Sequence, residues 1–439
     1  MQFEVEWEDA PGVRDRVLAA TWGRLSLKVD GSYVTEVLDL RSSSRRTGIY
    51  GSLFPLAEWI VDSWWNLLHE PCPTTPVVSA RAAKSWMRPF LQRHGLLSAR
   101  DGGALPDLSI WNDGAETILH WDPDPPPISE TRIRFVGQGH VRLPASAVQA
   151  GLTSLVNQVL GRLDALGLGE DEDTVRVRAA WAAVGDSTSD EPETCRRLAL
   201  LGLNPYDPDD ATEEIVALVG RAGAFLPPLL ADDLLTGTRP SELVADLAWV
   251  EAGARDFGTH ELPRLVRVGR TAHEAGYSAA REARRLLGLD TRSPVRDLPS
   301  VLVAGLGWSE EVERERARGA STRLDALVGW SAATQKPLSL VASRRSDTAT
   351  RFRLARAAYV ILASAVTAAP RLLTAAATHS QRESRAFAAE LLVPAAALEE
   401  RVRGAVSESQ VEEIAEEFRV SPLLVKHQIE NHRIGTIEA

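Results

Sequence analysis

Residues 351–394 read RFRLARAAYVILASAVTAAPRLLTAAATHSQRESRAFAAELLVP, and this stretch decides the fold predicted for the C-terminal part of the chain. Drawn as a helix, its first part is apolar on nearly every side, which is typical of a central helix buried within a domain. The apolar positions are Phe352, Leu354, Ala355, Ala358, Tyr359, Ile361 and Leu362. The sequence therefore predicts a buried helix that also carries Arg351, Arg353 and Arg356.

Two segments of this stretch, RFRLA (351–355) and FAAELLVP (387–394), resemble the ImmA/IrrE family of zinc metallo-endopeptidases. In that family, a helix of the type RFTLAHELGH supplies two His ligands and a Glu base, and a later helix of the type EANRFAAELLMP supplies a third ligand. The His, Glu and His positions fall on Arg356, Ala357 and Val360. The resemblance keeps only the third-ligand carboxylate, Glu383.

These replacements remove the zinc chemistry. A catalytic zinc ion needs about three N, O or S ligands and an open position, and His at i and i+4 places two imidazoles on one helical face. Arg356 and Val360 keep this spacing but cannot ligate a metal, and Ala357 cannot act as a general base. The resemblance therefore implies a pseudo-metallopeptidase, with no catalytic residue, no metal ligand set and no cofactor.

Two hypotheses concern the vacated site. In the first hypothesis, Arg356 forms an ion pair with Glu383 in place of zinc. The alternative to it is that Arg356 reaches solvent and Glu383 caps another group. The second hypothesis is a pocket or partner-binding surface for a small anion, because arginines gather along this part of the sequence. Its members would be Arg351, Arg353, Tyr359 and Arg382. The alternative is that these arginines lie on solvated faces of an acidic protein.

Other candidate ligands are sparse. His273-Glu274 begins like a zinc motif, but Tyr277 stands where the second His would be, so a helix start is the preferred interpretation. Cys72 and Cys195 are far apart in the sequence and predict neither a disulfide framework nor a zinc finger.

Composition narrows the class of protein. The 439-residue chain has 44% hydrophobic residues, which is enough apolar content to form several hydrophobic cores. Its net charge of −11 disfavours binding to nucleic acid. The start, MQFEVEWEDA, lacks the basic and apolar segments of a signal peptide. The longest apolar stretch, Ala357–Ala369, is shorter than the roughly 20 residues that span a bilayer. We therefore expect a cytoplasmic protein that does not enter a membrane.

The predicted fold class is α+β and multidomain. Residues 1–145 form a Trp-rich α+β module, with hairpins turning at Asp30-Gly31, Asn112–Gly114 and Gly137–Gly139. Helices are predicted at 52–70 and 80–97. Two roles are considered for Trp59, Trp64 and Trp65: a binding surface or part of the core. The core is preferred, because the apolar stripe of the predicted helix must be buried.

Two further regions follow. Residues 146–238 are predicted to be a helical linker domain, and residues 239–439 a degenerate ImmA/IrrE-like domain. The resemblance implies a mostly helical, zincin-like fold with a small sheet for the latter. Its end, 407–434, predicts two helices with Ser407 and Ser421 as N-caps. A structural hairpin is preferred over a DNA-binding pair, because the first helix is strongly acidic.

The resemblance also implies a function. Family members act in bacterial stress responses, mobile-element control or phage defence, often by cutting a repressor. An inactive version is expected to bind such a regulatory or defence protein, or to sense a small anionic ligand. Two classes remain as alternatives: an active metallopeptidase with a non-standard or partner-completed metal site that cleaves a regulatory protein, and a DNA-binding regulator.

Overall fold

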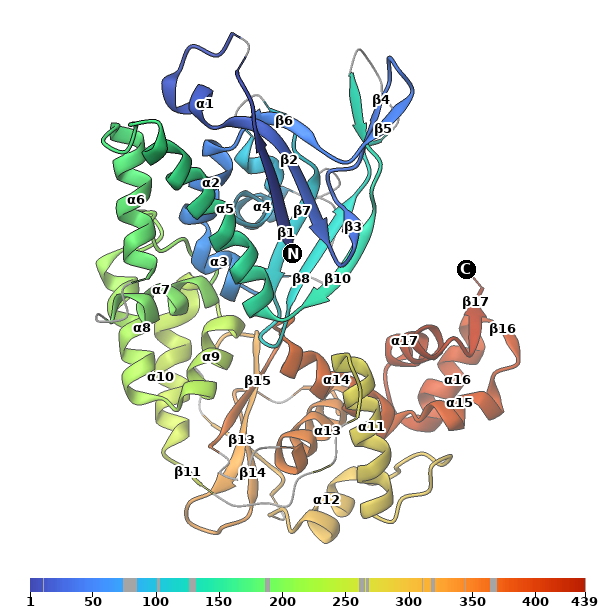
Figure 1. Ribbon diagram of the computed structural model, residues 1–439. Helices are drawn as coiled ribbons and strands as arrows, with labels where there is room; N and C mark the ends of the chain where they lie inside the picture. Colours follow the sequence, from blue (N-terminus) through green and yellow to red (C-terminus); the bar gives the residue numbers. More distant parts are fainter. Residues whose placement is uncertain are drawn as a thin grey trace. The chain divides into compact units, whose positions relative to one another are not determined.

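The structure, a computed structural model, contains two compact units, Met1–Val216 (unit 1) and Ala217–Ala439 (unit 2). Both units mix helices with several small sheets (Figure 1). Within the described residues, no helix combines the length and the apolar character needed to cross a bilayer. The described residues are 1–10, 12–73, 85–100, 103–125, 132–185, 190–259, 265, 268–309, 311–316, 320–343, 345–363 and 369–438.

Unit 1 begins with an antiparallel sheet in which β2 is central. Its members are β1 (Gln2–Trp7), β2 (Trp22–Val29), β3 (Ser32–Tyr33) and β6 (Ile49–Ser52), with α1 (Arg16–Ala20) between β1 and β2. Asp30 and Gly31 join β2 to β3 with φ values of 46° and 84°. This left-handed pair is the geometry of a two-residue hairpin turn, so the hairpin predicted there is confirmed.

Two more sheets complete the β part of unit 1. One contains β7 (Asp107–Asn112), β8 (Thr117–Asp122) and β10 (Gly139–Leu143), and the other β4 (Val37–Asp39), β5 (Ser44–Arg46) and β9 (Ile133–Phe135). The β7–β8 hairpin confirms the predicted turn at Asn112–Gly114.

The hairpin predicted at Gly137–Gly139 is wrong, because β9 pairs with β4 and β10 pairs with β8. The two glycines serve a different purpose. A Cβ at Gly139 would lie 2.1 Å from the Trp121 ring, and one at Gly137 would lie 3.3 Å from its Nε1. The chain therefore passes directly over an indole ring, which requires glycine at 139 and leaves little room for a side chain at 137.

Helices cover these sheets and bury the tryptophans. They are α2 (Phe54–Asp62), α3 (Trp64–His69), the 3-10 turns η1 (Ser85–Met87) and η2 (Leu96–Ala99), α4 (Arg88–His94), α5 (Ala145–Ala165), α6 (Glu172–Val184) and α7 (Glu191–Leu200). Trp59, Trp64 and Trp65 are at most 9% exposed, so they are core residues and not a binding surface. Of the helix predicted at 80–97, residues 80–84 lie outside the described residues.

The division into two units differs from the three predicted regions. Helix α5 places Val148, Leu152, Leu155 and Val159 in the same hydrophobic core as the β2 strand and α2. Residues 146–216 are thus part of unit 1, and not of a separate linker domain. The physical reason is that the apolar stripe of α5 needs an apolar partner, which the N-terminal sheet provides.

Unit 2 is built around a five-stranded sheet with the order β11-β13-β14-β12, in which β15 also pairs with β13. The strands are β11 (Phe257–Gly258), β12 (Glu313–Glu315), β13 (Leu324–Ser331), β14 (Pro337–Val341) and β15 (Arg371–Thr374). Strands β13 and β14 form an antiparallel pair. Strand β12 is parallel to β14, and the other pairs are antiparallel.

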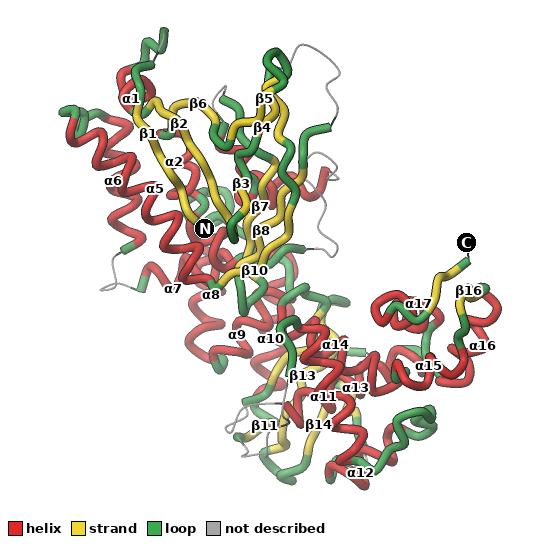
Figure 2. The backbone as a smooth tube through the Cα atoms, turned by 45° about the vertical axis from the view of Figure 1, so that its right-hand side comes forward, coloured by secondary structure: helices red, strands yellow, loops and turns green. Residues whose placement is uncertain are grey.

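Helices of unit 2 lie beside this sheet, and others continue the chain away from it (Figures 1 and 2). They are α8 (Glu213–Phe225, at the boundary of the units), α9 (Pro228–Gly237), η3 (Pro240–Glu242), α10 (Leu243–Ala254), α11 (Ala272–Leu286), α12 (Leu298–Leu306), α13 (Asp347–Ala363), α14 (His379–Leu392) and α15 (Ala395–Arg401). Helix α13 packs on β13 and α14, and α14 also packs on α11. These elements form the frame of the candidate site.

The chain continues as the predicted helical hairpin. Its helices are α16 (Glu408–Phe418) and α17 (Pro422–His432), flanked by the parallel strands β16 (Gly404–Val406) and β17 (Gly435–Ile437). Ser407 and Gln410 form a capping box, and the Ser421 side chain caps α17, as predicted. The inner apolar residues of both helices belong to the main core of unit 2, which agrees with a structural role.

Close packing of α11 on α14 depends on Gly276. A Cβ there would lie 2.5 Å from the Glu383 carbonyl oxygen and 2.9 Å from the Phe387 amide nitrogen. Because these are backbone atoms, we expect Gly276→Ala to lower the free energy of unfolding by about 1–3 kcal/mol, measured by urea unfolding. Gly220→Ala is the matched control, since a Cβ at Gly220 in α8 meets nothing within 4 Å. That variant should be as stable as the parent or more so, and equal stability of both variants would contradict the prediction.

Candidate functional site

Helix α13 is buried along most of its length, which confirms the predicted central helix. Its arginines are buried as well: Arg351, Arg353 and Arg356 are 7%, 3% and 3% exposed. The interpretation that these side chains lie on a solvated face is therefore wrong for all three. Arg344, another arginine in this part of the sequence, lies outside the described residues.

The guanidinium of Arg356 occupies the centre of the candidate site. Its Nη1 donates to Asp325 Oδ2 at 2.6 Å, and its Nε donates to Ser384 Oγ at 3.2 Å. Its Nη2 donates to the Thr374 carbonyl oxygen at 3.0 Å and to Gln381 Oε1 at 2.5 Å. All three nitrogens of the guanidinium are thus used, and one side chain of α13 connects β13, β15 and α14.

The local structure explains how these partners converge. Strand β13 has an irregular register between Leu324 and Ala326, so Asp325 sits at a bulge, where a side chain can be redirected out of the normal alternation. Gln381 on α14 holds the end of β15: its Oε1 accepts from the Thr374 amide at 3.0 Å, and its Nε2 donates to the Leu372 carbonyl oxygen at 2.7 Å.

The hypothesis that Arg356 pairs with Glu383 is wrong about the partner. Arg356 is ion-paired, but with Asp325. Two other residues of α14, Gln381 and Ser384, bond to Arg356. Glu383 is buried, and its Oε2 lies 3.9 Å from Nε2 of His379, one turn earlier on α14.

Positive charge exceeds negative charge around Asp325. Its second oxygen, Oδ1, pairs with Nη2 of Arg345 at 2.9 Å, so one carboxylate serves two guanidinium groups. Burial lowers the pKa of Arg356, and the charge of Asp325 opposes that effect. A third guanidinium, that of Arg385, has a pKa lowered by burial and by repulsion from Arg356 and Arg382.

The structure does not bring the predicted arginines into one pocket. Arg353 forms a bidentate pair with Glu313, both N–O distances being 2.7 Å. Arg351 donates instead to three carbonyl oxygens of other segments: Val295 at 2.6 Å, Arg296 at 3.2 Å and Arg419 at 3.1 Å. Each guanidinium therefore links α13 to a different neighbour, and together they fasten the helix in the domain.

The remaining predicted positions are also placed by the structure. Ala357 and Val360 are buried on α13, and the Tyr359 ring packs 5.4 Å from the Phe387 ring, between centroids. These are core positions. Arg382 is partly buried on α14 and its charge acts on Arg385.

Metal-ligating side chains are not clustered in the part of the chain that the structure describes: it contains no group of three or more His, Cys, Asp or Glu that could hold a metal ion. The His273-Glu274 segment is a helix start, as predicted, with Thr271 and Glu274 forming a capping box for α11. The Arg356 guanidinium carries a positive charge, which would repel a cation at short range.

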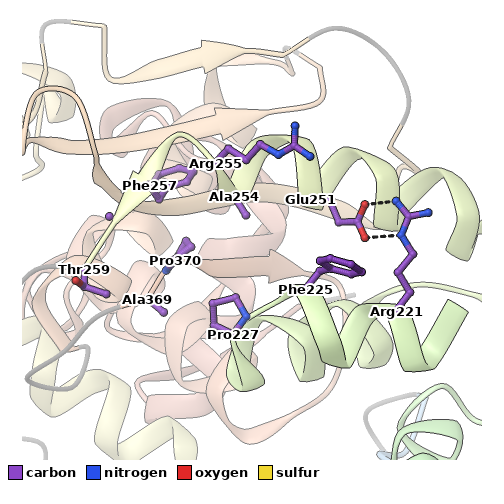
Figure 3. A pocket seen from close by; sticks show the side chains of 11 residues that line it. Arg221, Phe225, Pro227, Glu251, Ala254, Arg255, Phe257, Thr259, Ala369 and Pro370 are labelled. Carbon is purple, nitrogen blue, oxygen red and sulfur yellow. Dashed lines mark hydrogen bonds and ion pairs between the residues drawn. The ribbon is translucent and has the colours of Figure 1, made fainter.

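A separate pocket of about 760 Å³ lies elsewhere in unit 2 (Figure 3). Phe225, Pro227 and Phe257 supply apolar walls, and the Arg221 side chain faces Glu251 beside them, with Nε 2.7 Å from Oε1. None of the predicted site residues lines this pocket. A Cβ at Gly329 would lie 2.9 Å from Phe257 and 3.1 Å from Pro370, two residues that line this pocket.

Comparisons with known proteins give no family assignment. No protein-family model matches the chain, and no curated protein is similar to it.

Sequence reasoning missed Asp325, Gln381 and Ser384 as partners of Arg356. Asp325 has no motif around it, and only the fold brings its strand beside α13. Ser384 and Gln381 could have been found from helix geometry, since they lie one turn apart on α14.

Proposed function

We propose that unit 2 is a catalytically inactive, ImmA/IrrE-like pseudo-metallopeptidase with a zincin-like arrangement of α13 and α14. The chain would act in the cytoplasm as a binding, sensor or regulatory component of a bacterial stress response, mobile-element control or phage defence. The observation that carries this proposal is the buried Arg356 guanidinium, bonded to Asp325, Gln381 and Ser384 at the first-ligand position.

The geometry favours binding over hydrolysis. A hydrolytic site needs an open position for water and a group that can accept its proton. Here Ala357 replaces the base, and Val360 is an apolar side chain in the core. A helix fixed by buried arginines provides a rigid scaffold, which suits recognition of another protein, such as a regulator or a defence component.

The excess positive charge of this site favours a partner that presents an acidic or anionic group. Arg345 is 38% exposed at its side chain, and it shares Asp325 with Arg356. Arg385 donates to the carbonyl oxygens of Thr374 at 3.4 Å and Ala376 at 2.7 Å. An anion next to this group would balance charge that a single carboxylate leaves in excess.

The test restores the missing ligands. Zinc per chain is measured by elemental analysis of the parent protein and of a variant with Arg356→His, Ala357→Glu and Val360→His, purified without chelator or a metal-binding tag. We expect little zinc in the parent and about one zinc per chain in the variant, because His, His and Glu383 would complete the three-ligand set. Adding Glu383→Ala to the variant should remove the zinc.

Two outcomes would count against the proposal. A folded triple variant that binds no zinc, with folding checked by circular dichroism, would remove the resemblance on which the proposal rests. Stoichiometric zinc in the parent, lost on Glu383→Ala, would support the alternative, an active metallopeptidase with a non-standard site that cleaves a regulatory protein.

A further inference from the structure

Unit 1 contains an apolar hollow that no step above uses. It has a volume of about 640 Å³ and is lined by residues of β2, β6, α2 and η2 together with the segment 103–105. Leu25, Ile49, Leu53 and Leu56 are buried residues of its wall, each at most 5% exposed. Pockets that take small organic ligands have volumes of roughly 300–1,000 Å³ and mostly apolar walls.

Two aromatic side chains also line the hollow. Trp22 at the start of β2 is partly exposed, and Tyr50 on β6 is 44% exposed. Aromatic rings offer a large, rigid contact area to a flat or aliphatic ligand.

The charged side chains that line the hollow among the described residues are both positive. They are Arg100 and Arg132, and no Asp or Glu of the described residues lines the hollow, although the chain as a whole has a net charge of −11. Both arginines are exposed, and neither forms an ion pair with any residue that the structure describes. The backbone of Arg132 is fixed, because its carbonyl oxygen accepts a hydrogen bond from the Leu40 amide at 2.9 Å.

From these observations we propose that the hollow binds a small amphipathic organic anion. Its aromatic or aliphatic body would lie against Trp22, Tyr50 and the leucine wall, and its carboxylate, sulfonate or phosphate group would lie at Arg100 and Arg132. Guanidinium groups bind such oxyanions through charge-assisted, often bidentate, hydrogen bonds. This site belongs to unit 1 and does not depend on the function proposed for unit 2.

The probe is 1-anilinonaphthalene-8-sulfonate, which has an aromatic body and an anionic group and fluoresces in apolar surroundings. Its neutral counterpart, N-phenyl-1-naphthylamine, has the same ring system without the sulfonate. We expect saturable binding of the anionic probe to the full-length protein. Arg100→Gln combined with Arg132→Gln should weaken that binding by about tenfold or more, because charge-assisted bonds are lost, and leave binding of the neutral probe unchanged.

A blocking variant tests the location. Gly51 lines the hollow, and a Cβ added there meets nothing within 4 Å, so Gly51→Leu would extend into open space and occupy part of the hollow. We expect this variant to lose both probes while its melting temperature stays near that of the parent. Arg88→Gln, an exposed arginine of α4 outside the hollow, is the control for charge removal and should bind both probes normally.

The proposal would be overturned if the double arginine variant bound the anionic probe as well as the parent did. It would also be overturned if a folded Gly51→Leu protein kept both probes, because binding would then occur elsewhere. If Gly51→Leu does not fold, the comparison of the two probes on the arginine variant still decides the question.

Discussion

Replacing Asp325 by Asn is expected to lower the free energy of unfolding by about 3–5 kcal/mol, because a buried charge then loses its partner. Arg356 is 3% exposed, and Asp325 is the only carboxylate to which it is ion-paired among the described residues. Its other bonds, to Ser384, Gln381 and Thr374, are to neutral oxygens. The measurement is the urea unfolding curve of the full chain.

The double variant Asp325→Asn with Arg356→Met gives the sharper comparison. Removing both charges leaves no unpaired ion in the core, so the double variant should be more stable than Asp325→Asn alone. Lys426→Ala is the control, since it breaks an exposed pair with Glu408 and should cost at most about 1 kcal/mol. A loss for Asp325→Asn no greater than that of Lys426→Ala would mean that the neutral oxygens alone hold the guanidinium.

Replacing Glu70 by Gln should have a similar cost in unit 1, about 3–5 kcal/mol. Glu70 is 4% exposed. Its carboxylate accepts hydrogen bonds from Arg93 at 2.7 and 2.8 Å and from Asn66 at 2.8 Å, and it also bonds to His94 Nε2 at 3.0 Å. Arg93 also donates to the Gly202 carbonyl oxygen at 2.8 Å, which links α4 to the segment after α7. The variant leaves both basic side chains without their carboxylate.

The same residue predicts how stability depends on pH. Burial alone would raise the pKa of Glu70, but His94 and Arg93 outweigh it and lower the pKa to about 2 from 4.5. A carboxyl group with a lowered pKa stabilises the fold above its unfolded-state pKa, and this contribution is lost as the pH falls from about 4.5 towards 2. Unfolding curves between pH 6 and pH 3 should therefore converge for the parent and for Glu70→Gln.

The control for Glu70 is Glu36→Gln, which breaks the exposed pair with Arg45 and should change stability by at most about 1 kcal/mol. If the stability difference between the parent and Glu70→Gln were the same at pH 6 and pH 3, then the carboxylate of Glu70 would not be the source of the pH dependence.

Local signals in the sequence predicted local structure well. Ser407 with Gln410, and Ser421 with Pro422, mark the starts of α16 and α17 because capping involves residues only three positions apart. The Asp30-Gly31 turn is equally local, since left-handed φ values favour these residue types. The burial of α13 also followed from its own residues, which are apolar on nearly every side.

Interactions between distant segments could not be predicted in this way. Gly137 and Gly139 suggested a turn, but their role is to make room for Trp121, which comes from another strand. The partner of Arg356 was misassigned because the resemblance pointed to Glu383, whereas a bulge in β13 presents Asp325. Helix α5 looked independent because its apolar stripe does not reveal which surface it covers.

The place of α5 in the core of unit 1 has a consequence for synthesis on the ribosome. Strands β1 and β2 are made first, but the helix that shares their core is not complete until Ala165. Since a domain acquires its stability only when its core can close, the apolar surface that α5 covers stays exposed until that helix has been made. A chaperone that binds nascent apolar strands would therefore be expected to act on residues 1–145 before α5 emerges.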